Sequence, residues 1–388
     1  MRKICVITGT RAEYGLMQRL LHMLKDSPLV DLQLVVTNMH LSPKYGCTYK
    51  EIEADGFVIT KCVPIIDEDA EDCAGTTLHS MARAIDGLSN ALIELQPDIV
   101  CILGDRYEML AAAIAAMIQR IPIAHIGGGT VTEGAYDDAI RHSITKMSQL
   151  HFAPTEDCRK RIIQLGESPE RVFCIGSPGI ENIKTLPLKG KEEIEKDIQF
   201  EINEQTIMVT YHPVTLGRRT VEQDINDFID ALEMRPDLRI IFTMPNSDTG
   251  SQTIIEAINK FVSRHPERAT AHKSLGVVRY LSVVKEVVAV VGNSSSGVVE
   301  VPSFGIPTLN IGDRQKGRLA ADSVYNCDPD KVSILKGLDV VLSKQFREKA
   351  AITHNPYEIT GTSQIVFDVI SNYPLENLIP KRFYDLPE

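Results

Sequence analysis

Short apolar runs alternate with longer amphipathic segments along most of the 388-residue chain. The apolar runs are nearly continuous in Val, Ile and Leu, which is typical of strands that are covered on both faces. Strands of this kind, separated by helix-length segments, predict two parallel, doubly wound α/β sheets. The expected strands are residues 3–8, 32–37, 98–103, 122–126, 149–153, 171–175, 206–211, 239–243, 276–279, 287–291 and 307–311.

The chain is too long for one ordinary hydrophobic core, so we expect two domains. Gly and Pro cluster over residues 176–190, before a charged stretch that we interpret as a solvated helix face. We therefore expect one Rossmann-like domain over residues 1–180 and a second over 181–363, with the tail 364–388 folding back on the first. Because ligands of such sheets bind beyond the carboxyl ends of the strands, we expect the two domains to face one cleft.

Composition narrows the classes of ligand. The formal net charge of -11 argues against nonspecific binding to nucleic acid or to an anionic membrane. The apolar run after the initial Met is too short for a signal peptide, and no run has the length of a membrane span, so we expect a cytoplasmic protein. The eight cysteines form no Cys-x-x-Cys pair, and no Gly-x-Gly-x-x-Gly follows the first strand. We therefore expect reduced cysteines, no metal and no nicotinamide cofactor.

The first polar motif, residues 8–15, follows the opening strand and begins a helix. Gly9 permits a tight turn, and Arg11 can bind a phosphate beside the free N–H groups of the helix. Many strand-to-helix turns have the same pattern, so a purely structural interpretation remains open.

A second motif, residues 103–108, places Asp105 directly after a buried strand. A buried carboxylate is costly unless it is paired, and Arg106 is the adjacent candidate partner. Two interpretations follow. Asp105 is either half of a structural ion pair or a base that takes a proton from a substrate.

The third motif, residues 125–143, contains three successive glycines followed by several acidic side chains. The glycines allow the backbone to approach a ligand closely, and the carboxylates can transfer protons. Two of the acids stand four residues before a basic side chain, so pairing along a helix is the alternative. The candidates from this motif are Glu133, Asp137, Asp138 and Arg141.

The second half of the chain offers polar turns at three strand ends. A histidine precedes Pro213, a Ser-rich turn opens a helix over residues 291–300, and three cations lie within residues 312–318. Small residues, hydroxyl groups and helix N–H groups can form an anion-binding turn, although a simple serine N-cap is the alternative. The candidates are His212, Ser294, Ser295, Ser296, Gly297, Glu300, Arg314 and Arg318.

Taken in order, these motifs resemble the UDP-N-acetylglucosamine 2-epimerase family, particularly its hydrolysing branch from sialic acid biosynthesis. The resemblance rests on residues 8–15, 103–108, 140–148, 292–297 and 312–318. It implies a glycosyltransferase-B-type fold in which the second domain holds most of the UDP. It also implies ligand contacts for Arg11, His212, Ser294, Ser295 and Glu300, with Asp105 and the acidic loop at the sugar.

One position departs from the family pattern. Hydrolysing relatives usually carry Glu or Asp directly after the Gly pair, where this chain has Thr130. Glu133, Asp137 or Asp138 therefore has to supply the second acid, and the residues alone do not decide among them.

The resemblance implies hydrolysis of UDP-N-acetylglucosamine to UDP and N-acetylmannosamine by anti elimination and hydration. A relative acting on UDP-2,4-diacetamido-2,4,6-trideoxyglucose, a non-hydrolysing epimerase and a UDP-sugar sensor without turnover are the alternatives. We expect no cofactor, and a homodimer or homotetramer.

Overall fold

The computed structural model divides into two compact units, each built around its own parallel sheet. Unit 1 contains Met1–Thr130, Asp137–Asn182 and Ile359–Glu388, and unit 2 contains Val131–Tyr136 and Ile183–Glu358. The structure describes residues 1–71, 73–214, 216–217, 219–245 and 248–387.

Three short segments belong to a different unit from the one expected, and the shortest of them, residues 181–182, clusters with unit 1. Residues 131–136 cluster with unit 2 rather than with the N-terminal domain, because the Gly134 carbonyl accepts from the Leu216 N–H at 3.1 Å and the Glu133 N–H donates to Lys316. Residues 359–363 cluster with unit 1, since the Thr362 hydroxyl donates to the Ile175 carbonyl at 2.6 Å.

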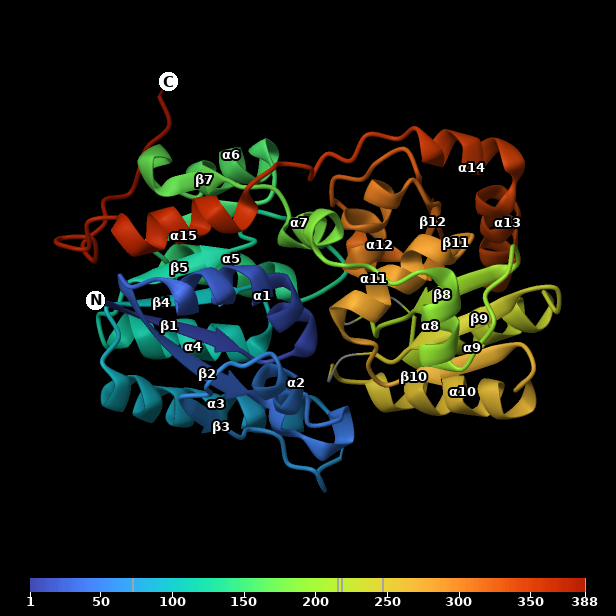
Figure 1. The fold of residues 1–388 in the computed structure, drawn as a ribbon, viewed down its shortest axis with the longest axis horizontal. Coiled ribbons are helices and arrows are strands. Elements are labelled where there is room, and N and C mark those ends of the chain that lie inside the picture. The colour runs from blue at the N-terminus through green and yellow to red at the C-terminus, as the bar shows by residue number, and fades with distance from the viewer. Residues whose placement is uncertain (72, 215, 218, 246–247, 388) are drawn as a thin grey trace. The chain divides into compact units, whose positions relative to one another are not determined.

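Unit 1 contains a seven-stranded sheet of order β3-β2-β1-β4-β5-β6-β7 in which every neighbouring pair is parallel. Helices α1 and α15 cover one face and α3 and α4 the other (Figure 1). Apolar residues fill both interfaces, which is why the strands lack polar alternation. The strands are β1 Arg2–Thr8, β2 Val30–Thr37, β3 Lys61–Val63, β4 Ile99–Leu103, β5 Ile123–Ile126, β6 Leu150–Ala153 and β7 Val172–Cys174.

The helices of unit 1 fill the connections between these strands. The α-helices are α1 Arg11–Asp26, α2 Tyr49–Ala54, α3 Ala74–Leu95, α4 Tyr107–Ile118, α5 Asp137–Met147, α6 Glu156–Gln164 and α15 Thr362–Asn372. Helix α7, Pro178–Thr185, contains the point at which the chain passes from unit 1 to unit 2. Short 3-10 turns are η1 Asn38–Leu41, η2 Pro43–Tyr45 and η3 Pro169–Arg171.

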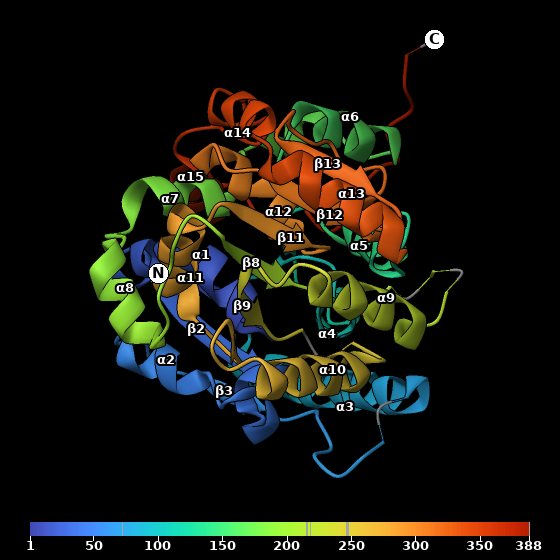
Figure 2. The same cartoon turned by 90° about the vertical axis from the view of Figure 1, so that its right-hand side faces the viewer.

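Unit 2 has a six-stranded parallel sheet of order β10-β9-β8-β11-β12-β13. Helices α9, α10 and α13 cover one face, and α8 and α11 lie on the other (Figure 2). The strands are β8 Thr206–Thr210, β9 Arg239–Thr243, β10 Ala269–His272, β11 Ala289–Gly292, β12 Thr308–Ile311 and β13 Val324–Cys327. The helices are α8 Lys191–Ile198, α9 Val221–Glu233, α10 Ser251–Arg264, α11 Gly276–Glu286, α12 Ser295–Val299, α13 Lys331–Leu342 and α14 Lys344–Ala351, with 3-10 turns η4 Val301–Phe304 and η5 Asp313–Gln315.

One expected strand is wrong, and three strands were missed. Residues 276–279 form the first turn of α11, whose apolar positions Leu281, Val283 and Val284 continue at helical spacing into a buried face. The missed strands β3, β10 and β13 are only three or four residues long and partly exposed. Short edge strands of this kind lack the continuous apolar run that marks the inner strands. The other expected strands are confirmed.

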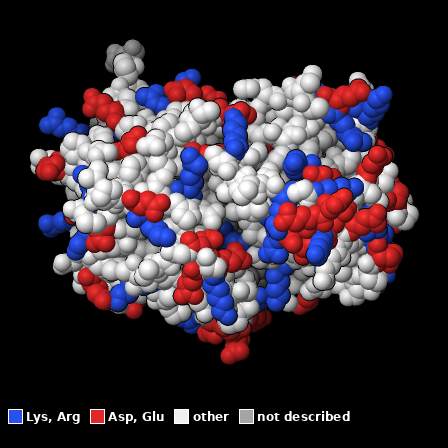
Figure 3. All heavy atoms as spheres, viewed as in Figure 1, with Lys and Arg blue, Asp and Glu red and all other residues white. Residues whose placement is uncertain are grey.

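The charged stretch after residue 190 forms α8. Lys189 pairs with Glu193 at 2.8 Å and with Asp197 at 2.5 Å, and Figure 3 shows acidic and basic side chains side by side over this helix. The run is therefore a solvated helix face. Among the residues that the structure describes, no helix has the length and apolarity needed to cross a bilayer.

The C-terminal tail docks on unit 1 through a buried carboxylate. Glu167 accepts from Lys381 Nζ at 2.8 Å and from Lys146 Nζ at 2.5 Å, and it lies 3.1 Å from His151 Nε2. Burial by itself raises the pKa of Glu167, but hydrogen bonds from His151, Lys146 and Lys381 outweigh it and lower the pKa to about 2. Glu167 therefore stays ionised at neutral pH and holds the tail in place.

Replacing Glu167 by Gln should lower the free energy of unfolding by about 3 to 5 kcal/mol at pH 7, because Lys381 loses its buried partner. The folded-state pKa lies below the ordinary 4.5, so this stabilisation is present above pH 4.5 and is lost as the pH falls toward 2. Urea unfolding across this pH range measures both effects. Glu156→Gln, at an exposed i,i+3 pair, is the control and should cost less than about 1 kcal/mol. Equal losses in the two variants would contradict the assignment.

Candidate active site

In unit 1, polar residues follow the neighbouring strands β1, β4 and β5. The turns after these strands begin at Gly9, Gly104 and Gly127. The carboxyl ends of parallel neighbours meet at one edge of the sheet, which is where ligands bind in this architecture. Arg11 lies at the start of α1 after the first of these turns, and Thr10 caps the helix.

Arg141 holds the loops of this edge together. Its Nε donates to Asp105 Oδ2 at 2.8 Å, and its Nη2 contacts the same oxygen. Its Nη1 donates to the Thr130 carbonyl at 2.9 Å and to Asp138 Oδ1 at 3.1 Å. The Arg141 side chain is only 1% exposed, whereas that of Asp105 is 26% exposed. The arrangement therefore fixes a carboxylate that solvent and small molecules can still reach.

The charge of Arg141 is secure despite its burial. Burial lowers the pKa of Arg141, but attraction to Asp105 and Asp138 outweighs it, and the pKa is raised. The sequence offered Arg106 as the adjacent candidate partner of Asp105, and the structure pairs Asp105 with the buried Arg141. Arg106 Nε donates to Glu108 Oε1 at 2.9 Å. Arg141 is 36 residues from Asp105 in the chain, so local spacing could not reveal it.

Asp137 and Asp138 occupy the first turn of α5, where the helix dipole favours carboxylates. Asp138 Oδ2 lies 3.5 Å from His142 Nε2, as the four-residue spacing predicted. Burial lowers the pKa of His142. Asp138 thus contacts both Arg141 and His142 on its own helix. At least this acid of the motif therefore takes part in pairing along the helix.

His125, on β5, is a functional candidate that we did not count. Its Nε2 lies 2.8 Å from the Gly104 carbonyl, directly before Asp105, and burial lowers its pKa to about 4. A neutral imidazole donates this hydrogen bond through Nε2–H. His125 therefore positions the turn that carries Asp105. The sequence signal that could have identified His125 is its position as a polar residue within the apolar strand β5.

Thr130 lies where the family pattern has an acid. Its side chain is buried, and its carbonyl accepts from Arg141. The preceding Gly129 has φ +80°, and a Cβ there would lie 2.3 Å from the Cys158 carbonyl oxygen. Only glycine therefore fits at position 129, and its close contact with the Cys158 carbonyl fixes the backbone path that leads to Thr130.

Glu133 is the one candidate acid that clusters with unit 2 among the described residues. It belongs to unit 2, its side chain is 56% exposed, and its carboxylate is 3.9 Å from Lys316 Nζ. Its N–H donates to the Lys316 carbonyl at 3.0 Å. The backbone of residues 131–136 is thereby attached to the turn after β12.

Within unit 2, Asn293 links three strand ends. Its Oδ1 accepts from the His212 N–H at 2.7 Å, and its Nδ2 donates to the His212 carbonyl at 2.8 Å. Its own carbonyl accepts from Arg314 Nη1 at 3.2 Å and from Gln315 Nε2 at 2.9 Å. The ends of β8, β11 and β12 are therefore held in one arrangement. Asn293 belongs to the motif of residues 291–300, but the sequence did not predict this role.

The serine turn follows β11 and opens the short helix α12. Ser294 Oγ caps the helix by accepting from the Ser296 N–H at 3.4 Å, Ser295 is exposed, and Ser296 Oγ accepts from Tyr280 at 2.8 Å. Glu300 is partly buried at the end of the helix. Gly297 is buried against β12, where a Cβ would lie 2.9 Å from Thr308 Cγ2. Packing against Thr308 therefore explains why residue 297 is a glycine.

Close approach also explains Gly292, the residue that ends β11. Its φ is +134°, and a Cβ would lie 2.0 Å from the Thr210 carbonyl oxygen on β8. The chain can turn directly out of the sheet only because this residue lacks a side chain.

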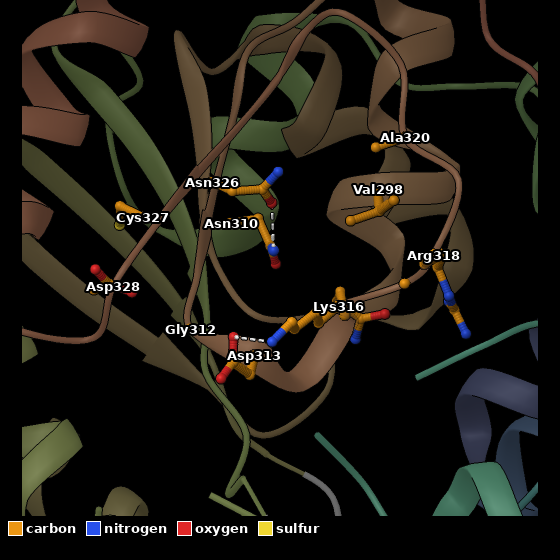
Figure 4. Close-up of a pocket in the computed structure, with 12 residues that line it drawn as sticks. Val298, Asn310, Gly312, Asp313, Lys316, Arg318, Ala320, Asn326, Cys327 and Asp328 are labelled. Carbon is orange, nitrogen blue, oxygen red and sulfur yellow. Dashed lines mark hydrogen bonds and ion pairs between the residues drawn. The ribbon is translucent and has the colours of Figure 1, made fainter. Parts of the chain in front are cut away.

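A cavity of about 370 Å³ lies in unit 2 between α12 and the ends of β12 and β13. Figure 4 shows Asn310 hydrogen-bonded to Asn326, at 2.8 Å, with Lys316 directed toward Asp313. Arg318 lines the same cavity and points away from the asparagine pair (Figure 4). The volume falls within the range of small-molecule sites.

Two parallel α/β units with polar turns at the carboxyl ends of their strands define the class of enzymes that bind nucleotides and related ligands there. Residues 22–371 match the family model described as UDP-N-acetylglucosamine 2-epimerase. The chain belongs to this family and is a UDP-sugar 2-epimerase.

Three curated relatives cover nearly the whole chain. It is 38% identical to a GDP/UDP-N,N'-diacetylbacillosamine 2-epimerase (hydrolyzing) of Campylobacter jejuni, over 99% of each chain. It is 39% identical to polysialic acid biosynthesis protein P7 of Escherichia coli, over 100% of this chain and 98% of the relative. A UDP-N,N'-diacetylbacillosamine 2-epimerase (hydrolyzing) of Legionella pneumophila is 35% identical over 98% of each chain.

A solved structure shares the fold. The UDP-GlcNAc 2-epimerase from Neisseria meningitidis, bound to UDP-GlcNAc, superposes with a TM-score of 0.78 and 19% identity, covering 95% of this chain and 99% of that one. The expected glycosyltransferase-B-type fold, with two parallel α/β domains, is confirmed.

Replacing Asn293 by Ala should lower the free energy of unfolding by about 2 to 4 kcal/mol, because it removes two buried hydrogen bonds and leaves the His212 backbone groups without partners. Urea unfolding measures the change. Asn326→Ala is the matched control, since Asn326 is exposed and its side chain accepts a hydrogen bond from Asn310. A loss at Asn293 no greater than that at Asn326 would show that the strand ends do not depend on it.

Proposed function

We propose that this enzyme hydrolyses UDP-N-acetylglucosamine with inversion at C2, releasing UDP and N-acetylmannosamine. The observation that carries the proposal is the accessible carboxylate of Asp105, fixed at the end of β4 by the buried Arg141. A base that abstracts a carbon-bound proton has to be held in one orientation. Family membership and the two hydrolysing relatives support the same reaction.

The first step is an anti elimination. In the α-linked substrate chair, the C2 hydrogen and the C1 diphosphate are both axial and on opposite faces of the ring. Asp105 takes the C2 proton, the electrons of the C2–H bond form the C1–C2 double bond, and UDP leaves with the electrons of the C1–O bond. The C2 hydrogen has no adjacent carbonyl and is only weakly acidic, so expulsion of UDP drives the step.

The leaving diphosphate needs positive charge and N–H donors. Arg11, Arg314 and Arg318 supply the charge, and the serine turn offers N–H groups at the start of α12. Glu300 accepts hydrogen bonds from the ribose hydroxyls, and His212 contacts the nucleotide. These roles are proposed from residue chemistry, from the position of each side chain at a strand end and from the family resemblance.

Hydration of the glycal completes the reaction. A second carboxylic acid protonates C2 from the opposite face, and water adds at the resulting cation at C1, passing its surplus proton to a carboxylate. Glu133, Asp137 and Asp138 are the candidates because Thr130 has no acid. No redox change occurs, and one water is consumed for each sugar released.

A second substrate is favoured by the relatives. Two of them are named for UDP-N,N'-diacetylbacillosamine, which is the 2,4-diacetamido-2,4,6-trideoxy sugar nucleotide. It shares UDP and the C2 acetamido group with UDP-N-acetylglucosamine and differs at C4 and C6. The elimination is unchanged, because it involves only C1 and C2.

In deuterium oxide, the released sugar should carry deuterium at C2, since the second acid, which reprotonates C2 from the opposite face, carries a deuteron from the solvent. Asp105→Asn should lower kcat by about 10²-fold or more, because the amide cannot accept the proton. NMR of the product and an assay of free UDP measure these effects. Asp98→Asn, at an exposed residue directly before β4, is the control. Near-normal turnover of the Asp105 variant would remove this residue from the mechanism.

The two UDP-sugars should be separated by kcat/KM measured under identical conditions. We expect UDP-N-acetylglucosamine to be turned over with free UDP as a product. A discrimination of about 10-fold or more corresponds to 1.4 kcal/mol of differential transition-state binding at C4 and C6. A higher kcat/KM for UDP-N,N'-diacetylbacillosamine would transfer the assignment to that substrate. UDP binding without turnover of either sugar would identify a sensor.

A further inference from the structure

Two buried glutamates of unit 1 lie on the helices that follow the turns after β1 and β4, and they take no part in the mechanism above. Glu13 is on α1, and Glu108 is on the first turn of α4. Both side chains are buried, at 6% and 0% exposure. Arg11 and Asp105, which we assign to the diphosphate and the C2 proton, belong to these same turns.

The two carboxyl groups converge on Gly9. Glu13 Oε2 accepts from the Gly9 N–H at 2.9 Å and from the Thr10 N–H at 3.2 Å. On its other side, Gly9 packs against Glu108, so that a Cβ at Gly9 would lie 2.7 Å from Glu108 Oε1. A single residue therefore separates two buried acids.

One oxygen of each carboxyl group lacks a partner. Within the described part of the chain, Glu13 Oε1 and Glu108 Oε2 are buried and make no hydrogen bond. Glu108 Oε1 receives Arg106 Nε at 2.9 Å. Two adjacent buried carboxylates facing one guanidinium cannot both ionise cheaply, so one of them retains a proton.

The surroundings identify Glu13 as the protonated member. Burial, followed by repulsion from Glu108, raises the pKa of Glu13 to about 8, although Arg106 and the Gly9 and Thr10 N–H groups act in the opposite direction. His40 on η1 lies 3.1 Å from Thr8, and burial lowers its pKa to about 3, so it contributes no charge near pH 7. Arg11, on the same helix as Glu13, is the remaining charged side chain of this turn.

We propose that Glu13 and Glu108 carry one proton between them at neutral pH, and that this half-ionised pair holds the Gly9–Arg11 turn and Arg106 in the geometry that binds the UDP-sugar. The proposal rests on the proposed function. Loss of the proton places a second anion beside Gly9. Repulsion then displaces Glu108 together with Arg106, and the turn that carries Arg11 loses its support. Glu13 and Glu108 are positioning residues, since neither is assigned a contact with the substrate.

The direction of the pH dependence follows from proton binding. The folded protein keeps the Glu13 proton up to about pH 8, whereas an unfolded glutamic acid loses it near 4.5. The contribution of Glu13 to stability is therefore full below pH 4.5 and falls as the pH rises toward 8. Substrate binding should weaken as the pH rises through 8.

The kinetic test compares the pH dependence of kcat/KM for the wild type, Glu13→Gln and Glu181→Gln between pH 6 and 9.5. In the wild type, kcat/KM should fall about 10-fold per pH unit above pH 8, mainly through KM. Relative to its own value at pH 6, Glu13→Gln should lack this decline, because the amide mimics the neutral acid. Glu181, another buried glutamate of unit 1, is the matched control and should keep the decline. An unchanged decline in Glu13→Gln would overturn the proposal.

A second test needs no substrate. Urea unfolding of the wild type should show stability falling between pH 4.5 and 8 relative to Glu13→Gln, and parallel curves would overturn the proposal. Should Glu13→Gln not fold, Glu108→Gln replaces it. Removing the Glu108 charge lowers the pKa of Glu13, so the fall should end at lower pH. If neither UDP-sugar is turned over, the proposed function fails, and these unfolding curves, with calorimetric titration of UDP at pH 6 and 9, still decide on the pair.

Discussion

The geometry of unit 1 depends on one buried guanidinium. Arg141 reaches the loop after β4 through Asp105, the loop after β5 through the Thr130 carbonyl, and its own helix through Asp138. A buried cation without partners is very costly, so the three groups are held by electrostatics rather than by apolar packing. The same cation pairs with Asp105, the residue that we propose as the base. In the proposed elimination, the expulsion of UDP drives the step because the C2 hydrogen is only weakly acidic.

In unit 2, a neutral residue, Asn293, holds the strand ends together through hydrogen bonds. Asn293 has both donor and acceptor atoms, so it can satisfy both backbone groups of His212 while its own carbonyl receives two side chains. Its buried amide costs little because every one of these bonds is made. Asn293 adds no charge to these strand ends. The cations after β12, which we assign to the diphosphate, therefore need not balance a charge on Asn293.

The sequence predicts the layers and the strand ends, since both depend on local patterns. Inner strands such as β4 are apolar, and Asp105 lies in the turn directly after β4. What local patterns cannot supply is pairing at long range. Arg106 was the adjacent candidate partner for Asp105, but no local spacing pointed to Arg141 on α5, with which the structure pairs Asp105. The strand expected over 276–279 failed for a related reason: four apolar and basic residues do not distinguish a strand from the first turn of an amphipathic helix.

Thr130 can replace an acid without disturbing Asp105 because the contact with Arg141 uses its backbone. The carbonyl of residue 130 accepts from Arg141 whatever side chain is present, and Gly129 fixes the path of the loop. In the proposed mechanism, Thr130 therefore leaves position 130 without an acid, while Asp105, the proposed base, stays anchored by Arg141. Asp138, which follows Thr130 in the chain, also contacts Arg141. Its carboxylate is therefore already used in pairing with the guanidinium. Glu133 has no such commitment: it is mostly exposed, and its backbone is attached to the turn after β12, whose cations we assign to the diphosphate. On these grounds Glu133 is the better proposal for the acid that protonates the glycal.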